Sequence, residues 1–257
     1  MSFILRFDPS GQVLLESAAA NVATSIFHRL RSNDDYHLVL TGGSSGIQFS
    51  KDLGLEISRR VTHGEDRGYD LSGKKLHIWF SDERYVEFDD ENRNDTAVLA
   101  ALNDSELTVV AHRVLPPSEG SVKKVSEAYE EELQSVLGDT AFDFTILGFG
   151  NDGHLASCFP GEEKVLNSTK LALPIENSPK PPAKRTTITL SRLGKSRSIV
   201  IFAIGENKKD ALIETLANTG KMPAEVLATF FVTGEPMIFT DLFLKDKNYL
   251  TSTGEMR

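Results

Sequence analysis

The stretch His37-Leu38-Val39-Leu40-Thr41-Gly42-Gly43-Ser44-Ser45-Gly46 decides the fold class of this chain. Its first four residues form a short apolar run, and the glycines and hydroxyl residues that follow are typical of a tight turn. An apolar pattern with helical spacing comes next, at 47–60, and a second strand-like run lies at 76–80. A strand, a helix and a further strand in this order predict a βαβ unit with two parallel strands.

The same alternation of short apolar runs and helical patterns continues on both sides of this unit. We predict further strands at 3–7, 142–147, 186–190, 199–204 and 230–232. We predict further helices at 14–30, 95–102, 122–137 and 208–216. This order favours an α/β fold with an open, largely parallel central sheet and helices on both faces.

Composition narrows the class of protein and its partners. The 257 residues include 28 Lys and Arg against 37 Asp and Glu, which gives a net charge of −9. We expect neither nucleic acid nor an anionic membrane as a partner of so acidic a chain, although a local basic pocket can still bind a small anion. Cys158 is the only cysteine, which excludes an intramolecular disulfide and a cysteine-rich zinc site.

The expected location is the cytoplasm. The N-terminus is charged by Arg6 and has no long apolar segment of the kind found in a secretory signal. No stretch approaches the ~18 consecutive apolar residues of a membrane helix. A chain with one cysteine fits a reducing compartment, most simply the cytosol. The sequence leaves the oligomeric state open.

Two segments are expected to be loops. Residues 177–184 hold three prolines, which forbid a helix and favour an extended chain. We expect an ordered surface loop that leads into the strand near Arg185, and a domain boundary is the alternative. Residues 82–94 are rich in Asp and Glu, and the simplest interpretation is a solvated acidic turn.

Ligands of open α/β sheets bind outside the carboxyl ends of the strands, so the residues that follow each strand are candidates for a site. The turn of Thr41, Gly42, Gly43 and Ser44 combines glycines, hydroxyl groups and a helix N-terminus, which suits a phosphate. It lacks the Gly-Lys-Ser/Thr ending of a P-loop. A phosphate-binding turn and a plain tight turn both remain open.

Charged residues follow two other predicted strands. After 76–80, Arg84 suits bidentate binding of a phosphate, and Asp82 suits a base or an orienting group. A salt-bridged surface turn is the alternative. After 199–204, Lys208 lies at the start of a predicted helix, where it either binds a phosphate or is simply exposed.

The segment Gly148-Phe149-Gly150-Asn151-Asp152-Gly153-His154 formally matches the dinucleotide-binding pattern Gly-x-Gly-x-x-Gly. We reject this interpretation because Pro160 interrupts any helix that begins at Gly153 and because no acidic residue follows at the required distance. The segment instead predicts a rigid loop that presents Asp152 and His154, with His154 suited to general-base catalysis. A structural or incidental histidine is the alternative.

No other motif points to a metal or a covalent nucleophile. The sequence contains neither an H-E-x-x-H spacing nor a G-x-S-x-G nucleophile elbow. Cys158 has no obvious partner base and lies in an apolar run, which indicates a packing role. We therefore expect no metal and no cofactor.

Taken together, these segments resemble the 6-phosphogluconolactonase family, within the superfamily that also contains glucosamine-6-phosphate deaminase. The strongest match is 147–161, which is similar to the family signature Gly-x-Gly-x-Asp-Gly-His-x-x-Ser-Leu-Phe-Pro-Gly. Further matches lie at 41–44, 81–86, 178–182 with 185–190, and 205–208. Because these segments must meet at one site, we expect residues 1–257 to form one domain of modified Rossmann type.

The chain departs from the family pattern at a few positions. Thr41 replaces a usual Ser, Gly46 a common Pro, Arg93 the Ser of a Ser-Asn pair, and Cys158 a Leu. None of these changes removes a group that the chemistry needs. Phe159 stands where the deaminase branch has a glutamate, and the loss of this acid–base group favours the lactonase branch.

The resemblance implies hydrolysis of 6-phospho-D-glucono-1,5-lactone to 6-phosphogluconate, without a metal or a covalent intermediate. His154 would deprotonate the attacking water, and Asp152 or Asp82 would orient this histidine. Backbone N–H groups around Gly42 and Gly43 are candidates for oxyanion stabilisation. The expected phosphate ligands are Arg84, Lys208 and the turn from Thr41 to Ser44, with Arg185 a weaker candidate.

Three other functions fit parts of the sequence. A glucosamine-6-phosphate deaminase would share the fold and the phosphate site but would release ammonia. A non-catalytic sugar-phosphate sensor is a second alternative, although such regulators usually have a DNA-binding segment and this chain has no basic helix-turn-helix candidate. An NAD(P)-dependent dehydrogenase rests on the glycine pattern alone.

Overall fold

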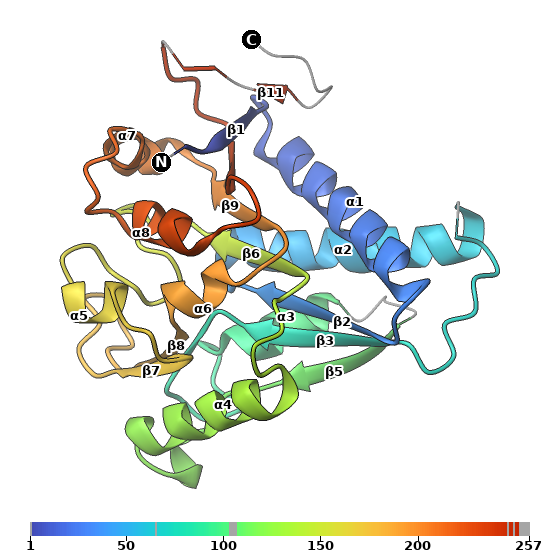
Figure 1. Ribbon diagram of the computed structural model, residues 1–257, viewed down its shortest axis with the longest axis horizontal. Helices are drawn as coiled ribbons and strands as arrows, with labels where there is room; N and C mark the ends of the chain where they lie inside the picture. Colours follow the sequence, from blue (N-terminus) through green and yellow to red (C-terminus); the bar gives the residue numbers. More distant parts are fainter. Residues whose placement is uncertain (1, 65, 103–106, 246, 249, 252–257) are drawn as a thin grey trace.

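The computed structural model describes residues 2–64, 66–102, 107–245, 247–248 and 250–251, and its centre is an eight-stranded sheet (Figure 1). The strand order is β11-β1-β10-β9-β6-β2-β3-β5. The strands are β1 (Ile4–Phe7), β2 (Asp35–Leu40), β3 (Lys75–Phe80), β5 (Thr108–His112), β6 (Phe144–Gly148), β9 (Ile199–Ala203), β10 (Met237–Thr240) and β11 (Leu250–Thr251). All neighbouring strands run parallel, which confirms the predicted parallel sheet.

Helices cover both faces of this sheet (Figure 1). One apolar cluster holds side chains of α1 (Gly11–Leu30), α2 (Gly43–His63) and α3 (Asn94–Ala101). The other holds side chains of α4 (Val122–Val136), α6 (Leu190–Gly194), α7 (Lys209–Leu216) and α8 (Pro223–Phe230). The connections contain α5 (Glu163–Leu166) and two 3-10 turns, η1 (Pro117–Glu119) and η2 (Glu206–Lys208). The predicted α/β fold with helices on both faces is therefore confirmed.

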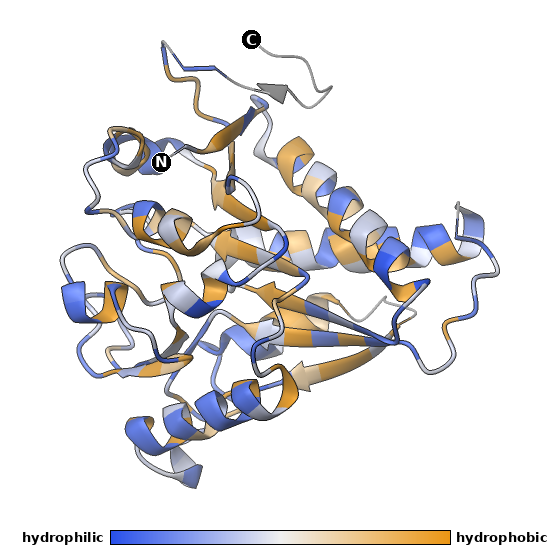
Figure 2. Cartoon of the chain, in the orientation of Figure 1, coloured by the Kyte–Doolittle hydropathy of each residue, from blue (hydrophilic) through white to orange (hydrophobic). Residues whose placement is uncertain are grey.

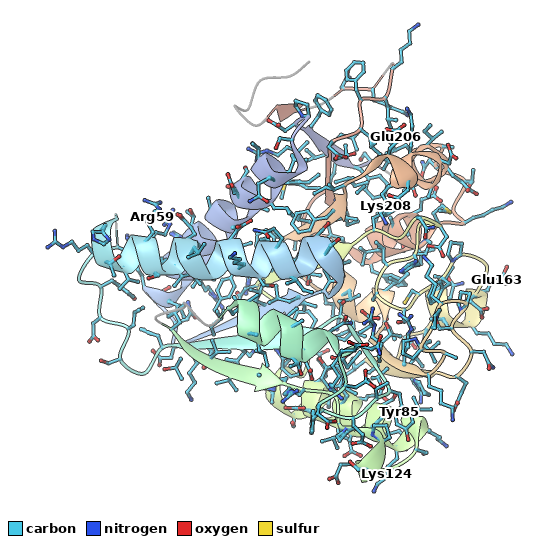
Figure 3. The ribbon with its side chains drawn as sticks, turned by 180° about the vertical axis from the view of Figure 1, so that it is seen from behind. Arg59, Tyr85, Lys124, Glu163, Glu206 and Lys208 are labelled. Carbon is cyan, nitrogen blue, oxygen red and sulfur yellow. The ribbon has the colours of Figure 1, made fainter. Side chains whose placement is uncertain are left out.

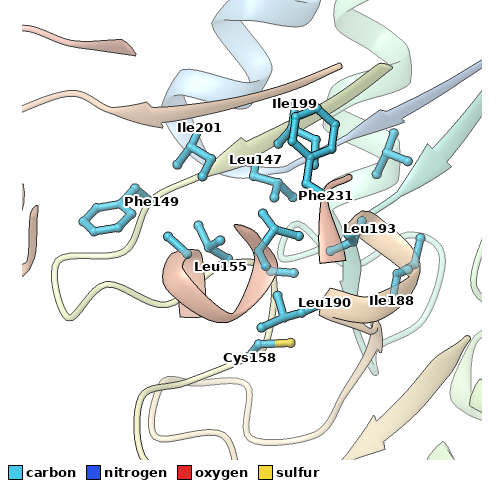
Figure 4. Packing of buried hydrophobic residues seen from close by; sticks show 14 of the residues in the cluster. Leu147, Phe149, Leu155, Cys158, Ile188, Leu190, Leu193, Ile199, Ile201 and Phe231 are labelled. Carbon is cyan, nitrogen blue, oxygen red and sulfur yellow. The ribbon is translucent and has the colours of Figure 1, made fainter. Parts of the chain in front are cut away.

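Alternation of side chains along each strand explains how one sheet supports two cores. In β2, Leu38 and Leu40 enter the cluster with α1 and α2, whereas Val39 enters the cluster with α4 and α8. In β3, Ile78 enters the cluster with α1 and α2, and Trp79 enters the cluster with α4 and α8. Successive side chains point to opposite faces, so a strand covered on both sides is apolar throughout. Figure 2 shows apolar residues along the central strands, and Figure 4 shows packing in the cluster with Val39.

A second, three-stranded sheet begins where β3 ends. Its strands β4 (Asp82–Arg84), β8 (Arg185–Ile188) and β7 (Ala172–Ile175) pair antiparallel in the order β4-β8-β7. Only Ser81 separates β3 from β4, and its N–H donates to Leu40 O at 2.8 Å. The register sets Arg84 opposite Arg185. This small sheet therefore brings two distant candidate segments together at the end of β2 and β3.

The predicted strand at 230–232 is wrong. Phe230 is the last residue of α8, and the strand that follows this helix is β10. A short apolar run looks alike at the end of a buried helix and in a strand, so periodicity does not separate the two. The strand predicted at 186–190 is β8, which ends at Ile188 because Thr189 caps α6. The sequence also did not predict β4, β5, β7, β10, β11, α5, α6 or α8.

The two predicted loops are ordered. In 177–184, Ser178 N donates to Ala183 O at 2.8 Å, which closes the loop before β8 begins. The acidic segment 82–94 is mostly exposed in its middle but buried at both ends, so the solvated turn is shorter than expected. Within the described part of the chain, no helix has the length and apolar character needed to cross a bilayer.

Candidate active site

A pocket of about 310 Å³ opens at the carboxyl ends of β2, β6 and β9, next to β4. This is where ligands bind in open α/β sheets. Nine of the ten predicted site residues line the pocket: Thr41, Gly42, Gly43, Ser44, Asp82, Arg84, His154, Arg185 and Lys208. The tenth, Asp152, contacts the His154 ring. Seen from behind, Lys208 lies near the start of α2, whereas Arg59 marks the opposite end of that helix (Figure 3).

Three glycines shape the end of β2 and the start of α2, two because a side chain would have no room and one because of its backbone conformation. A Cβ atom at Gly42 would lie 1.8 Å from Asn94 Oδ1, and one at Gly46 would lie 2.1 Å from Thr41 O. Gly43 has a φ of +74°, a left-handed conformation that favours glycine. Gly42 caps α2 without a side-chain hydrogen bond, so N–H groups of the first helical turn are available to an anion in the pocket.

The chain turns directly after β6 to present His154. Gly150 N donates to His154 O at 2.9 Å, and Gly153 N donates to Gly150 O at 3.0 Å. A Cβ atom at Gly150 would lie 2.0 Å from His154 Nδ1, so only glycine admits the ring here. The glycines therefore shape a tight loop and not the start of a helix, in agreement with the rejection of a dinucleotide-binding turn.

The partner of the His154 ring is Asp152. His154 Nδ1 lies 2.5 Å from Asp152 Oδ1, which also accepts from His154 N at 3.3 Å. A carboxylate accepts the proton that Nδ1 carries, so Nε2 is left unprotonated in the neutral ring. Burial lowers the pKa of His154 below its ordinary value, against the raising effect of Asp152. The Phe159 ring, 4.7 Å from the imidazole, contributes to this burial. The neutral ring is the form that a general base requires.

Asp82 has different partners. Ser157 Oγ donates to Asp82 Oδ2 at 2.6 Å, and Arg185 Nη1 lies 3.6 Å from the same oxygen. Of the two carboxylates that the sequence offered for orienting His154, the structure therefore sets Asp152 against the ring. Burial raises the pKa of Asp152, but the hydrogen bond and charge of His154 outweigh this effect and lower it to about 2.

The guanidinium of Arg185 is buried and most of its donors have partners. Nε donates to Pro182 O at 3.0 Å, and Nη2 donates to Lys180 O at 3.0 Å and Pro181 O at 3.2 Å. With the contact to Asp82, these bonds join β4, β8 and the proline-containing loop. This geometry suits a structural tie better than a phosphate ligand.

Arg84 and Lys208 line the pocket and have donor groups without a protein partner among the described residues. Arg84 Nη1 donates to Asn92 O at 2.6 Å, whereas Arg84 Nε is buried and has no hydrogen-bond partner among the described residues. Burial, followed by the charge of Lys180, lowers the pKa of Lys208. Its ammonium group has no hydrogen bond or ion pair within the described ranges. Two such cations in one polar pocket suit a phosphate.

Asn94 and Lys180 are among the pocket residues that the sequence did not mark as site residues. Asn94 begins α3, where its Nδ2 donates to Asp82 O at 3.0 Å and its backbone N–H donates to Glu83 Oε1 at 2.8 Å. Lys180 reaches the pocket from the proline-containing loop and donates to Asn151 Oδ1 at 2.5 Å. Long-range packing of the loops brings both residues into the site, and the one signal for Asn94 was the Ser-Asn pair of the family pattern, which this chain has as Arg93-Asn94. The match of 178–182 to the family pattern was the one available signal for Lys180.

The departure from the family pattern at Arg93 has a structural explanation. Arg93 is buried, and its Nη2 donates to Asp95 Oδ2 at 2.6 Å and to Val114 O at 2.7 Å. Arg113 Nε donates to the same Asp95 oxygen at 2.9 Å. This network fixes the first turn of α3 and with it Asn94.

Cys158 is a free, buried core residue, as the sequence analysis expected. Burial raises the pKa of its thiol to about 12. A thiol in this state is a poor nucleophile. The packing role predicted for Cys158 is confirmed.

Comparisons with known proteins point to one family. The model of the family described as glucosamine-6-phosphate isomerases/6-phosphogluconolactonase matches residues 9–232. A 6-phosphogluconolactonase from Mycobacterium tuberculosis is 30% identical over 237 residues, which cover 89% of this chain and 91% of the relative. One from Streptomyces coelicolor is 30% identical over 224 residues, with 83% and 82% covered.

Solved structures show the same fold. A 6-phosphogluconolactonase from Trypanosoma cruzi superposes with a TM-score of 0.76 at 24% identity, over 93% of this chain and 94% of the other. One from Thermotoga maritima gives 0.72 at 23% identity, over 93% and 99%. Because the family model matches most of this chain, the chain belongs to the glucosamine-6-phosphate isomerase/6-phosphogluconolactonase family.

Proposed function

We propose that this chain hydrolyses 6-phospho-D-glucono-1,5-lactone to 6-phospho-D-gluconate. One observation carries the proposal: the imidazole of His154, held by Asp152, shares a pocket with the available donors of Arg84 and Lys208. A base beside a carbonyl and cations beside a phosphate are what this substrate requires. The relatives named 6-phosphogluconolactonase support the same activity.

The proposed reaction begins with proton transfer from water to His154 Nε2 as the water oxygen bonds to the lactone carbonyl carbon. The carbonyl electrons move onto oxygen, and N–H groups at Gly42 and Gly43 stabilise this oxyanion. When the intermediate collapses, the bond from carbon to the ring oxygen breaks and His154 returns its proton to that oxygen. Arg84 and Lys208 hold the phosphate throughout.

Phe159 favours the lactonase over the deaminase reaction. Its side chain is buried and its ring lies against His154. An apolar ring at this position supplies no acid–base group for amino-sugar chemistry. The same pocket without catalysis would make a sugar-phosphate sensor, but a neutral histidine oriented by a carboxylate favours an enzyme.

The test is a coupled assay with freshly generated 6-phosphogluconolactone, corrected for spontaneous hydrolysis. We expect His154→Ala to lower turnover about 10²–10⁴-fold, because the base is lost, with an unchanged circular dichroism spectrum. His63→Ala, exposed near the end of α2, is the matched control and should keep wild-type turnover. Near-normal turnover in His154→Ala would sink the assignment of the base. Equal hydrolysis of gluconolactone without phosphate would instead contradict the phosphate site.

We also propose that the reaction is metal-independent, since general-base attack on a lactone, an activated ester, needs no Lewis acid. Incubation with EDTA followed by gel filtration should leave kcat unchanged. A loss of activity that added divalent metal restores would contradict this expectation.

The acidic net charge of −9 supports a small phosphorylated lactone as the partner, without nucleic acid or membrane. The single, buried Cys158 fits the expected cytoplasmic location.

A further inference from the structure

The side chain of Lys180, from the loop 177–184, contacts both Asp152 and His154. Lys180 Nζ donates to Asp152 Oδ1 at 3.2 Å and to Asn151 Oδ1 at 2.5 Å, and it lies 3.3 Å from His154 Nδ1. The Lys180 side chain is 34% exposed and lines the pocket. We infer that Lys180 is a positioning residue for His154: its ammonium group holds the Asp152 carboxylate against the imidazole and joins the two loops.

The backbone of Lys180 is itself fixed. Lys180 O accepts from Arg185 Nη2 at 3.0 Å and from Ser178 Oγ at 2.9 Å, and Lys180 N donates to Ser178 Oγ at 3.2 Å. Arg185 is held in turn by Asp82. Because the backbone is already ordered, the Lys180 side chain gives up only its own rotamer freedom when its ammonium binds Asp152. Contacts thus run from Asp82 through Arg185 and Lys180 to Asp152, which gives Asp82 and Arg185 an indirect role in placing His154.

The ammonium group also disfavours a positive charge on His154. Burial has the largest effect on the His154 pKa and lowers it. Asp152 from the same loop and Asp82 from β4 raise this pKa, whereas Lys180 lowers it. A cation 3.3 Å from a ring nitrogen repels imidazolium more than neutral imidazole. Asp152 raises the His154 pKa and so favours the protonated ring, and Lys180 offsets this effect. Asp152 can then orient the ring while the ring stays neutral.

Lys180 differs from Lys208, the second lysine that lines the pocket. The ammonium of Lys180 contacts Asn151 and Asp152, whereas that of Lys208 has no such partner in the described residues. Lys180 should therefore affect kcat and its pH dependence, and Lys208 should affect KM. This inference rests on the proposed function, because it concerns the base of the proposed reaction.

The first experiment compares Lys180→Met, which removes the charge, with Lys180→Arg, which keeps it. Lys184→Met is the matched control, because Lys184 lies in the same loop, is exposed and pairs with Glu176. In Lys180→Met we expect a plateau kcat lower by about tenfold, from misplacement of the base, with KM changed less than kcat. Lys180→Arg should recover most of kcat, and Lys184→Met should match the wild type.

The direction in which the acid limb of the kcat–pH profile moves is the decisive observation. The neutral ring is the active form, so kcat falls as the pH drops through the His154 pKa, which lies below its ordinary value of 6.5. Asp152 keeps its own bonds to His154 N and Nδ1, so loss of the neighbouring cation raises that pKa and the acid limb of Lys180→Met should move upward by about 0.5–1 pH unit. Lys180→Arg should keep the wild-type limb. An unmoved limb with kcat near wild type, or a rise in KM alone, would overturn the positioning role.

A second measurement does not depend on turnover. Titration of the His154 ring by NMR should give a higher midpoint in Lys180→Met than in the wild type or Lys184→Met. An equal midpoint in all three proteins contradicts the inference. If the wild type fails to hydrolyse the lactone, the proposed function is wrong, and the NMR comparison still decides whether Lys180 acts on His154.

Discussion

Lys208 and Lys209 are neighbours in sequence with different surroundings. Lys208 lines the pocket, whereas Lys209 Nζ pairs with Glu206 Oε1 at 2.8 Å and has no place in the pocket lining. We expect Lys208→Ala to raise KM about 10- to 100-fold through loss of one charge-assisted hydrogen bond, with kcat within about threefold. Steady-state kinetics measure both quantities. Lys209→Ala is the control, and an equal KM in the two variants would remove Lys208 from the phosphate site.

At this residue scale, the sequence identified the chemical groups but not their partners. It marked His154 as a base and left Asp152 and Asp82 as equal candidates for orienting it. The spacing of residues does not say which way a carboxylate turns at the end of a strand. In the structure, Asp82 turns toward Ser157 and Arg185, and only Asp152 of the two contacts the His154 ring.

At the scale of elements, α8 shows how a helix start depends on one buried side chain. Glu225 is fully buried, and its Oε1 accepts from Gly220 N at 2.9 Å. Its Oε2 accepts from Lys221 N at 3.1 Å and Met222 N at 2.8 Å. We expect Glu225→Gln to lower the free energy of unfolding by about 1–3 kcal/mol, because the amide NH₂ would face a backbone N–H.

Urea unfolding at neutral pH measures this loss. Glu214→Gln on the neighbouring helix α7 is the control, because Glu214 is exposed and has no buried partner to lose among the described residues. Its effect should stay within about 0.5 kcal/mol. A Glu225→Gln protein as stable as Glu214→Gln would show that these bonds do not hold the start of α8.

Elements were predictable where their side chains repeat with a clear period. β2, α2 and β3 were found because each has a buried stripe or a continuous apolar run. β4 was missed because its three residues, Asp82, Glu83 and Arg84, are all charged. It is a strand only because β8 pairs with it, and that pairing is a long-range property.

At the scale of the whole molecule, the two halves of the chain complete one sheet. β1 pairs with β10, and β10 pairs with β9, so strands distant in sequence depend on each other. We therefore expect one cooperative unfolding transition, as proposed for a single domain of residues 1–257. Calorimetry should give a ratio of calorimetric to van't Hoff enthalpy of about one. Two resolved transitions would argue against one domain.

The overall charge of −9 argued against broad polyanion binding but did not locate any positive site. The fold places Arg84, Lys180 and Lys208 around one pocket, although they come from three separate segments. A small anion can bind there while the net charge of the molecule stays negative.

The sequence by itself determined the α/β class, the strand–turn–helix unit after His37 and the residue types of the site, because periodicity and turn chemistry are local properties. Only the tertiary structure decided that Asp152 contacts His154, that Asp82 pairs with Arg185, and that Lys180 reaches the base. Most of these contacts join segments far apart in the chain, and even the nearest pair depends on how the packed loops turn its side chains. Their geometry follows from the packing of the two sheets and not from any local pattern.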